Sequence, residues 1–389
     1  MKKQACFKVG LQCIRVWRDS LSRRIRPDGQ GCPSLPVTQK ALVLNHAEKQ
    51  ESINAEAKLA PDERPRVSVI VVTKCNHAEA EAAVASIIAS DYPPDRREIV
   101  VIEETDKPQP FSGPGVRYFA IARLNRGVGA ARNEGLLHAS GEIIAFTDDD
   151  CLVDRNWLKE LVWPLLANPE AGATAGAVLV PDCGPIGQCE SILGFPGGGV
   201  RYAHASRGSL MPLPTFSTCN CAIRRSTLKD GLRFNEGFNF AGEDQMLSRA
   251  ISAKHPILYN PDARVRHKPR DSFAGVFKWL VRRGQAQVET VRHSKSKAEH
   301  IAYMIYTSLP LRLLAAAALF AALSLPVVPA LGILFLFYYA CMIWRFRWAR
   351  AYYPPLRTMA LLPIVKLVMD AGMSAGVLKA LFAKKRVQP

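Results

Sequence analysis

The chain has 389 residues, of which 48% are hydrophobic and 22% are charged, so we expect one large domain with attached segments. Its formal net charge of +17 would suit nucleic acid or an anionic membrane. Residues 301–389 contain ten Lys and Arg and one acidic residue, whereas acidic residues outnumber basic ones across 67–263. Because the positive charge borders a hydrophobic C-terminus and no nucleic-acid recognition motif is present, the expected partner is a membrane, with no nucleic acid.

The ten cysteines include no C-x-x-C pair, and the closest two are Cys219 and Cys221. Reduced thiols are therefore expected, rather than a zinc site or a disulfide framework. Residues 1–65 are interpreted as a basic N-terminal extension and linker. Lys8 and Gln12 interrupt the apolar residues near its start, which argues against a signal peptide. A helix on a lipid surface and a solvated tail both remain open.

From residue 66 onward, β-branched apolar runs alternate with helical patterns. Strands are predicted at 66–73, 98–103, 116–121 and 141–150, and helices at about 78–90, 127–138 and 156–166. This alternation predicts an α/β fold with a doubly wound, mostly parallel sheet. Ligands of such sheets collect beyond the carboxyl ends of the strands. Thr73, the pair Glu103–Glu104 and the run Asp148–Asp150 all lie at such ends.

The C-terminal region is expected to associate with a membrane. Residues 313–344 contain no charged residue, which exceeds the length of one span, and Pro326 and Pro329 lie in the middle. A tight helical hairpin over 311–344 is the preferred interpretation, and a single kinked span is the alternative. Basic residues flank both sides, which places both ends in the cytoplasm by the positive-inside rule.

A third apolar segment covers 356–382. Lys366 and Asp370 lie four residues apart on one helical face, so this segment is expected to lie in the membrane interface or to be re-entrant. The predicted organisation is therefore the N-terminal extension, an α/β domain over 66–270, a basic amphipathic connector over 271–310 and a membrane-associated helical region over 311–389.

Three consecutive carboxylates, Asp148, Asp149 and Asp150, end the apolar run "IIAF". Like charges repel one another, so a cation is expected beside them. Mg²⁺ takes one or two protein carboxylates, completes its shell with water and substrate phosphates, and neutralises charge on a phosphate leaving group. A solvated acidic turn is the alternative. Because the preceding strand is buried and a helix follows, the sequence favours Mg²⁺ or Mn²⁺ carrying a diphosphate.

Three further motifs admit a functional and a structural interpretation. The stretch 125–135, "NRGVGAARNEG", is a glycine-bearing turn into a helix whose start favours an anion, but its spacing matches neither a P-loop nor a dinucleotide fingerprint. Glu243 and Asp244 precede a helix, where they either cap it or supply a general base. His267 is either a surface imidazole or a metal ligand.

In their order along the chain, these motifs resemble family 2 glycosyltransferases of the glycosyltransferase A fold. The resemblance rests on "VSVIVVT", "EIVVIEETD", "LNRGVGAARNEGL", "GEIIAFTDDDC", "CNCAIRRSTL" and "RFNEGF…GEDQMLSRA". It covers residues 66–270, which would be the catalytic domain. The part from "FKWLVRRGQA" through the apolar hairpin is more loosely similar to membrane-attached bacterial members that build surface polysaccharides.

The resemblance implies which residues bind the donor. A nucleotide-diphosphate sugar would be held by strand ends, by the turn into the helix and by basic residues of the connector: Thr73, Glu103, Glu104, Asn125, Gly127, Arg132, Asp148, Asp149, Arg282 and Arg283. The family usually has Asp-Asp where this chain has the Glu pair. The Q-x-x-R-W motif of processive members is absent, so processivity is not implied.

The resemblance also implies the metal ligands and the base. Asp148, Asp150 and His267 would bind the metal, with the two aspartates forming a D-x-D motif. Asp244 would be the catalytic base, with Glu243 beside it.

The implied activity is an inverting sugar transfer to a hydroxyl of a lipid-linked glycan acceptor, in cell-surface polysaccharide synthesis. Asn220 and Cys221 would lie on the acceptor side. The expected location is the bacterial inner membrane, with the catalytic domain facing the cytoplasm. The alternative is a catalytically inactive relative that serves as a membrane scaffold in a polysaccharide assembly complex.

Overall fold

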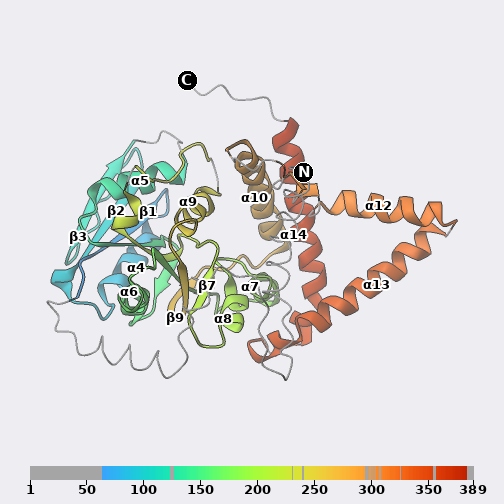
Figure 1. The fold of residues 1–389 in the computed structure, drawn as a ribbon, viewed down its shortest axis with the longest axis horizontal. Helices are drawn as coiled ribbons and strands as arrows, with labels where there is room; N and C mark the ends of the chain where they lie inside the picture. Colours follow the sequence, from blue (N-terminus) through green and yellow to red (C-terminus); the bar gives the residue numbers. More distant parts are fainter. Residues whose placement is uncertain are drawn as a thin grey trace, which may run out of the picture.

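The computed structural model describes residues 64–122, 127–229, 231–238, 241–293, 298, 301–302, 304–305, 308–324, 326–353 and 356–382. These residues form an α/β domain and a group of C-terminal helices beside it (Figure 1). The extension predicted over 1–65 lies almost entirely outside the described residues.

The strands of the described chain form one mixed sheet. Their bounds are Val67–Thr73 (β1), Arg97–Glu104 (β2), Val116–Ile121 (β3), Ile143–Asp148 (β4), Cys151–Val153 (β5), Ala173–Leu179 (β6), Met211–Leu213 (β7), Asn220–Arg224 (β8) and Ile257–His267 (β9). The order across the sheet is β3-β2-β1-β4-β8-β6-β9-β5, and β7 pairs with β9. Strands β3, β2, β1 and β4 are parallel, β8 runs antiparallel to β4, and β6 and β9 are parallel again.

The predicted α/β fold class with a mostly parallel sheet is confirmed. The helices of the domain are His77–Ile88 (α4), Val128–His138 (α5), Trp157–Ala167 (α6), Pro185–Ile192 (α7), Gly199–Ser206 (α8), Glu243–Ser252 (α9) and Phe273–His293 (α10), with short 3₁₀ turns at Pro94–Arg96 and Arg225–Leu228. The strand predicted over 141–150 is shorter than expected. It ends at Asp148, and a turn then leads directly into β5.

Helices cover both faces of the sheet, which explains why its strands read as continuous apolar runs. On one face, α4 and α6 pack against alternate residues of β1, among them Val69 and Val71. On the other face, α5 and α9 pack near Ile70 and Phe146. Each central strand is thereby buried on both sides, so the positions of the strand ends are fixed.

The C-terminal helices form a triangle (Figure 1). Its sides are Leu309–Ala322 (α12), Val327–Arg345 (α13) and Leu356–Phe382 (α14), with a 3₁₀ turn at Arg347–Ala351. Helix α14 lies against α10, and α12 and α13 diverge from their shared turn. The uncharged stretch is therefore an open V, and not a tight hairpin or one kinked helix. By length and hydropathy alone, α13 and α14 are the described helices able to cross a membrane.

Candidate functional site

The acidic residues predicted at strand ends meet at one edge of the sheet. The parallel register pairs Thr73 of β1 with Glu103 of β2, and Val72 of β1 with Asp148 of β4. Parallel strands that end level with one another bring their carboxyl ends together, as expected for a ligand site in an open α/β sheet. This edge is the candidate functional site.

The consecutive aspartates at the end of β4 have three different partners. In chain order, Asp148 contacts Arg132, Asp149 contacts Thr73, and Asp150 faces His267. The hydroxyl of Thr73 donates to Asp149 Oδ2 at 2.7 Å. Burial, together with the charges of Asp150 and Asp148, raises the pKa of Asp149 to about 6. The three side chains therefore point apart, which reduces the repulsion between adjacent carboxylates.

Arg132 connects β4 to the start of α9. Its guanidinium is buried and donates to Asp148 Oδ1 at 3.0 Å and to Glu243 Oε1 at 2.5 Å. Burial alone would lower the pKa of Arg132, but Glu243, Asp148 and Asp244 outweigh burial and raise it. Gly127 precedes α5 with φ of +84°, a conformation that favours glycine and orients the helix that carries Arg132.

Helix α9 begins with the acidic pair at the same edge. Glu243 and Asp244 are both buried, and Gly242 precedes them with φ of +110°. Burial and the charge of Asp244 raise the pKa of Glu243, against the effect of Arg132. Asp244 Oδ1 accepts from the backbone N–H of Gln245 at 2.7 Å. Glu243 is thus tied to Arg132, whereas Asp244 is held by its own helix.

A candidate metal centre forms where β5 pairs with β9. The antiparallel register places His267 opposite Cys151, next to Asp150. The imidazole Nε2 lies 3.5 Å from Asp150 Oδ1, and Nδ1 lies 2.7 Å from the carbonyl oxygen of Lys268. A carbonyl can only accept, so Nδ1 donates to it. Nε2 of the neutral ring is then unprotonated and able to bind a metal.

The donors at this centre fit a hard divalent cation. Asp150, Cys151 and His267 lie close enough together to share an ion. Burial raises the pKa of the Cys151 thiol well above its ordinary range, and its sulfur is a soft donor that suits Zn²⁺ better than Mn²⁺ or Mg²⁺. The carboxylate and the imidazole remain, and oxygen and nitrogen donors of this kind suit Mn²⁺ or Mg²⁺.

A cluster of aromatic side chains surrounds the end of β2 and was not predicted. The Tyr118 hydroxyl donates to Glu103 Oε2 at 2.5 Å, and burial and this carboxylate raise the pKa of Tyr118 to about 12. The rings of His77 and Phe111 lie beside it, with centroids 4.4 Å apart. Glu104 instead pairs with Lys74 at 2.9 Å. These aromatic residues come from the start of α4, from the loop after β2 and from β3, where no periodic pattern distinguishes them.

The basic residues predicted in the connector differ in position. Arg283 of α10 lies over the ring of Trp279 at 5.3 Å and over Phe195 at 5.9 Å, and its charge acts on Glu243. Arg282 is exposed on the same helix. Asn125, predicted to bind the donor, lies outside the described residues.

The acceptor-side role expected for Asn220 and Cys221 is wrong. Asn220 is buried, accepts from the Trp157 indole at 2.8 Å and donates to the carbonyl oxygens of Ala177 and Ala263 at 2.9 and 2.8 Å. Its amide therefore joins β8 to α6, β6 and β9. Cys221 is fully buried in the core. Neither side chain is accessible to an acceptor.

A second buried ion pair near the metal centre was also missed. Arg270 Nε lies 3.2 Å from Glu190 Oε1, and the guanidinium lies 4.1 Å from the centre of the Trp279 ring. The charge of Arg270 lowers the pKa of Asp150, partly offsetting burial. Arg270 follows His267 by three positions in "HKPR", so proximity to a candidate ligand was the only signal in the sequence.

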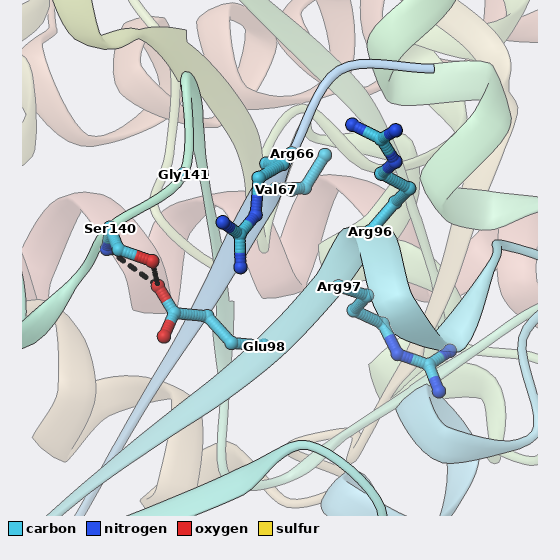
Figure 2. A pocket seen from close by; sticks show the side chains of 7 residues that line it. All are labelled: Arg66, Val67, Arg96, Arg97, Glu98, Ser140 and Gly141. Atoms are coloured by element: carbon cyan, nitrogen blue, oxygen red, sulfur yellow. Dashed lines mark hydrogen bonds between the residues drawn. The ribbon is translucent and has the colours of Figure 1, made fainter. Parts of the chain in front are cut away.

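A small polar cavity lies at the opposite edge of the sheet, where β1, β2 and β4 begin (Figure 2). Its volume is about 30 Å³, and it is lined by Arg66, Val67, Arg96, Arg97, Glu98, Ser140 and Gly141. That volume suits one or two water molecules and is far too small for a nucleotide. The cavity is therefore separate from the candidate site.

The chain is similar to known glycosyltransferases. Residues 68–232 match the family model for glycosyl transferase family 2. The chain is 32% identical over 123 residues to the glucosyl-dolichyl phosphate glucuronosyltransferase of Haloferax volcanii, and 24% identical over 241 residues to glycosyltransferase AglE of the same organism. It is 30% identical over 149 residues to the beta-monoglucosyldiacylglycerol synthase of Synechocystis sp..

These matches are partial. They cover 30%, 58% and 35% of this chain, and 39%, 74% and 30% of the three relatives, in the order given. A solved structure with the same fold is the mannosyltransferase PcManGT from Pyrobaculum calidifontis, in complex with GDP-Man and Mn²⁺. It is 22% identical, has a TM-score of 0.54, and the alignment covers 87% of this chain and 95% of that one.

Proposed function

Because residues 68–232 of this chain are a glycosyl transferase family 2 domain, we propose that it transfers a sugar from a nucleotide-diphosphate sugar to an acceptor hydroxyl. The observation that carries the proposal is that the carboxylates at the sheet edge have different partners. Asp150 faces His267, whereas Asp148 is held by Arg132. The first arrangement suits a metal-bound diphosphate, and the second positions α9 with its acidic pair beside it.

The donor's nucleoside is proposed to bind at the end of β2. Glu103 offers a carboxylate to ribose hydroxyls, and the half-buried rings of His77 and Tyr118 beside it offer faces to the base. Thr73 fixes Asp149 beside these side chains. The half-buried start of α5 after Gly127 is proposed to supply backbone N–H groups toward the phosphates.

Asp150 and His267 are proposed to hold Mg²⁺ or Mn²⁺, with Asp148 as a further carboxylate nearby. When bound, the cation offsets the negative charge that develops on the departing diphosphate. Arg132 holds Asp148 in place through the hydrogen bond to its Oδ1 at 3.0 Å.

Asp244 is the proposed general base. It takes the proton of the acceptor hydroxyl while that oxygen bonds to the anomeric carbon and the bond from this carbon to the diphosphate oxygen breaks. Attack from the face opposite the leaving group inverts the configuration, and a single carboxylate suffices because the diphosphate leaves without protonation. Glu243 is unsuited to this role because it is bound to Arg132.

The proposed acceptor is a lipid-linked saccharide. The basic connector and the exposed apolar helices lie beside the catalytic domain, which suits a substrate at a membrane surface. Two of the similar proteins are named for lipid-linked or lipid glycosyl transfer. The proposed setting is polysaccharide synthesis at the bacterial inner membrane, with the catalytic domain in the cytoplasm.

A thermal-shift screen of the purified full-length chain tests the proposal. Nucleotide-diphosphate sugars are expected to stabilise it in the presence of Mn²⁺, by about 2.7 kcal/mol at a hundredfold excess over Kd. The Asp150→Asn variant should lose the Mn²⁺-dependent part of this stabilisation, and the exposed control Glu170→Gln should keep it. If no nucleotide sugar stabilises the protein and none is hydrolysed, the chain is not a transferase and the scaffold alternative holds.

A further inference from the structure

Helix α14 is attached to the catalytic domain near both of its ends. Near its start, Thr358 Oγ1 donates to Gln188 Oε1 of α7 at 2.5 Å, and Cys189 Sγ donates to the Thr358 carbonyl at 3.2 Å. Near its end, Arg292 of α10 donates to the Ala380 carbonyl at 3.4 Å. A helix with both ends on the same water-exposed domain cannot cross a bilayer between them.

The middle of α14 is equally tied to that domain. A Cβ placed on Gly284 of α10 would lie 3.0 Å from the Cα of Gly376 and 2.2 Å from the carbonyl oxygen of Met373, so the two backbones touch. Small residues permit this close approach. The partner α10 carries Lys278, Arg282, Arg283, Glu289 and Arg292, which excludes it from hydrocarbon. Helix α14 is therefore a helix on the domain surface, despite its hydropathy.

The V of α12 and α13 is anchored at two points of α14. The N–H of Leu309 donates to Ser374 Oγ at 3.3 Å at the start of α12. The hydroxyl of Tyr338 donates to the Pro363 carbonyl at 3.1 Å, and the next tyrosine bonds one turn earlier on α14. The lengths of α12 and α13 between these anchors and the turn therefore limit how far the turn can lie from α14.

Those lengths are too short for a crossing. At 1.5 Å per residue, α12 extends about 21 Å, and α13 extends about 18 Å from its first residue to Tyr338. The turn of the V therefore lies at most about 20 Å from α14, whereas the hydrocarbon core of a bilayer is about 30 Å thick.

Interface-seeking residues are present only at the base of the V. Trp344 and Tyr352 are exposed there, among the basic residues Arg345, Arg347 and Arg350. At the turn, Leu323 and Val328 are 59% and 82% exposed, and residues 321–333 contain no charged residue, Trp or Tyr. A crossing helix pair would present aromatic or basic anchors at the second membrane surface as well.

A cluster of charged side chains lies where α12 meets α14, and we place it at the level of the lipid headgroups. Asp370 of α14 accepts from Arg312 of α12 at 2.9 Å and from Lys366 of its own helix. Two cations thus share one carboxylate, and these side chains retain exposed surface. The excess positive charge is complementary to anionic lipid headgroups.

We propose that the α12–α13 V inserts into a single leaflet of an anionic membrane, from the side of the catalytic domain, and that none of the described helices crosses the bilayer. Helix α14 lies in the plane of the headgroups, between the domain and the lipid. This inference concerns membrane attachment and is independent of the glycosyl transfer proposed above.

Thiol accessibility in phosphatidylcholine–phosphatidylglycerol proteoliposomes tests the inference. Leu323→Cys and Val328→Cys are made separately in a full-length chain in which Cys6, Cys13, Cys32, Cys75, Cys183 and Cys341 are replaced by serine. Buried cysteines stay, because they are shielded. A matched chain that retains Cys75, exposed on the catalytic domain, is the control.

A membrane-impermeant maleimide is added to sealed vesicles, to vesicles opened with a pore-forming peptide, and to detergent solution. Cys75 of protein facing outward should react in sealed vesicles. Cys75 of any protein facing inward should react once the vesicles are opened. Both turn cysteines should stay at background until detergent is added. Reaction of either in opened vesicles would show that the V reaches the far surface, and reaction in sealed vesicles to the extent of Cys75 would show that it does not insert. Either result overturns the inference, whatever the activity.

Discussion

Arg132 and Glu243 form a buried ion pair of 2.5 Å although 111 residues separate them in the chain. Arg132→Met would leave two carboxylates, Glu243 and Asp148, without their shared cation. Removing one partner of a buried pair typically costs about 3–5 kcal/mol, and we expect a loss of this size in chemical denaturation.

The double variant separates charge pairing from packing. Glu243→Gln in the Arg132→Met background removes the buried uncompensated charge, so part of the lost stability should return. If the two substitutions destabilise additively, the two side chains do not act as an ion pair.

Asp244→Asn should abolish sugar transfer and leave donor binding intact. The amide cannot accept the proton of the acceptor hydroxyl, and loss of a general base lowers turnover by about 10²–10⁴-fold. Donor affinity, measured by calorimetry, should change little because Asp244 does not contact the proposed donor pocket. Asp262→Asn, in the middle of β9, is the matched control with unchanged turnover. Normal turnover of Asp244→Asn would reject it as the base.

The sequence predicted the fold well where a strand is buried on both faces. The stretch 67–73 is β-branched and apolar throughout, and it is the strand between β2 and β4. Strand β8 carried no such signal, because "NCAIR" is short and mixed, and its antiparallel place beside β4 depends on long-range pairing. The local pattern of hydrophobic residues in a strand does not determine which distant strand pairs with it in the sheet.

The same distinction applies to the site. The aspartate run was visible because charges end an apolar strand. For Arg132 the family resemblance implied donor binding, and nothing in the sequence indicated its pairing with Asp148 and Glu243. The contact of Arg270 with Glu190 joins β9's end to a helix that the sequence did not predict. Asn220 was predicted on the acceptor side within the stretch "CNCAIRRSTL" that carries the resemblance, whereas its three hydrogen bonds are all internal.

His267→Gln should weaken metal binding. Losing even an outer-shell partner costs metal affinity about 10- to 100-fold, so loss of a ligand should raise the Mn²⁺ concentration for half-maximal activity at least about tenfold. Direct Mn²⁺ binding, followed by electron paramagnetic resonance, should fall in parallel. His255→Gln, two residues before β9 begins, serves as the control. Equal Mn²⁺ affinity in both variants would remove His267 from the metal centre.

Asn220→Ala should destabilise the fold without altering acceptor use. The substitution leaves the Trp157 indole and two carbonyl groups without partners, and each buried unsatisfied group costs about 1–3 kcal/mol. The expected signature is a lower denaturation midpoint with an unchanged KM for acceptor in the folded fraction. A raised acceptor KM with unchanged stability would restore the acceptor-side role.

Glu98 is expected to make stability depend on pH in the acid range. Although burial alone would raise its pKa, hydrogen bonds from Ser68, Ser140 and Arg117 outweigh burial and lower it from 4.5 to about 2. Folding therefore favours the ionised form. The stabilisation is complete above the unfolded pKa and is lost as the pH falls toward 2.

Glu98→Gln should accordingly lower stability at pH 7 by about 1–2 kcal/mol, a figure reduced for solvent screening of this partly exposed group. The difference from the natural chain should shrink between pH 4.5 and the folded value of about 2. Thermal unfolding at pH 7.5 and pH 3 measures it, with Glu170→Gln as the exposed control. A difference that stays constant across this range would mean that Glu98 contributes through packing and neutral hydrogen bonds, and not through its charge.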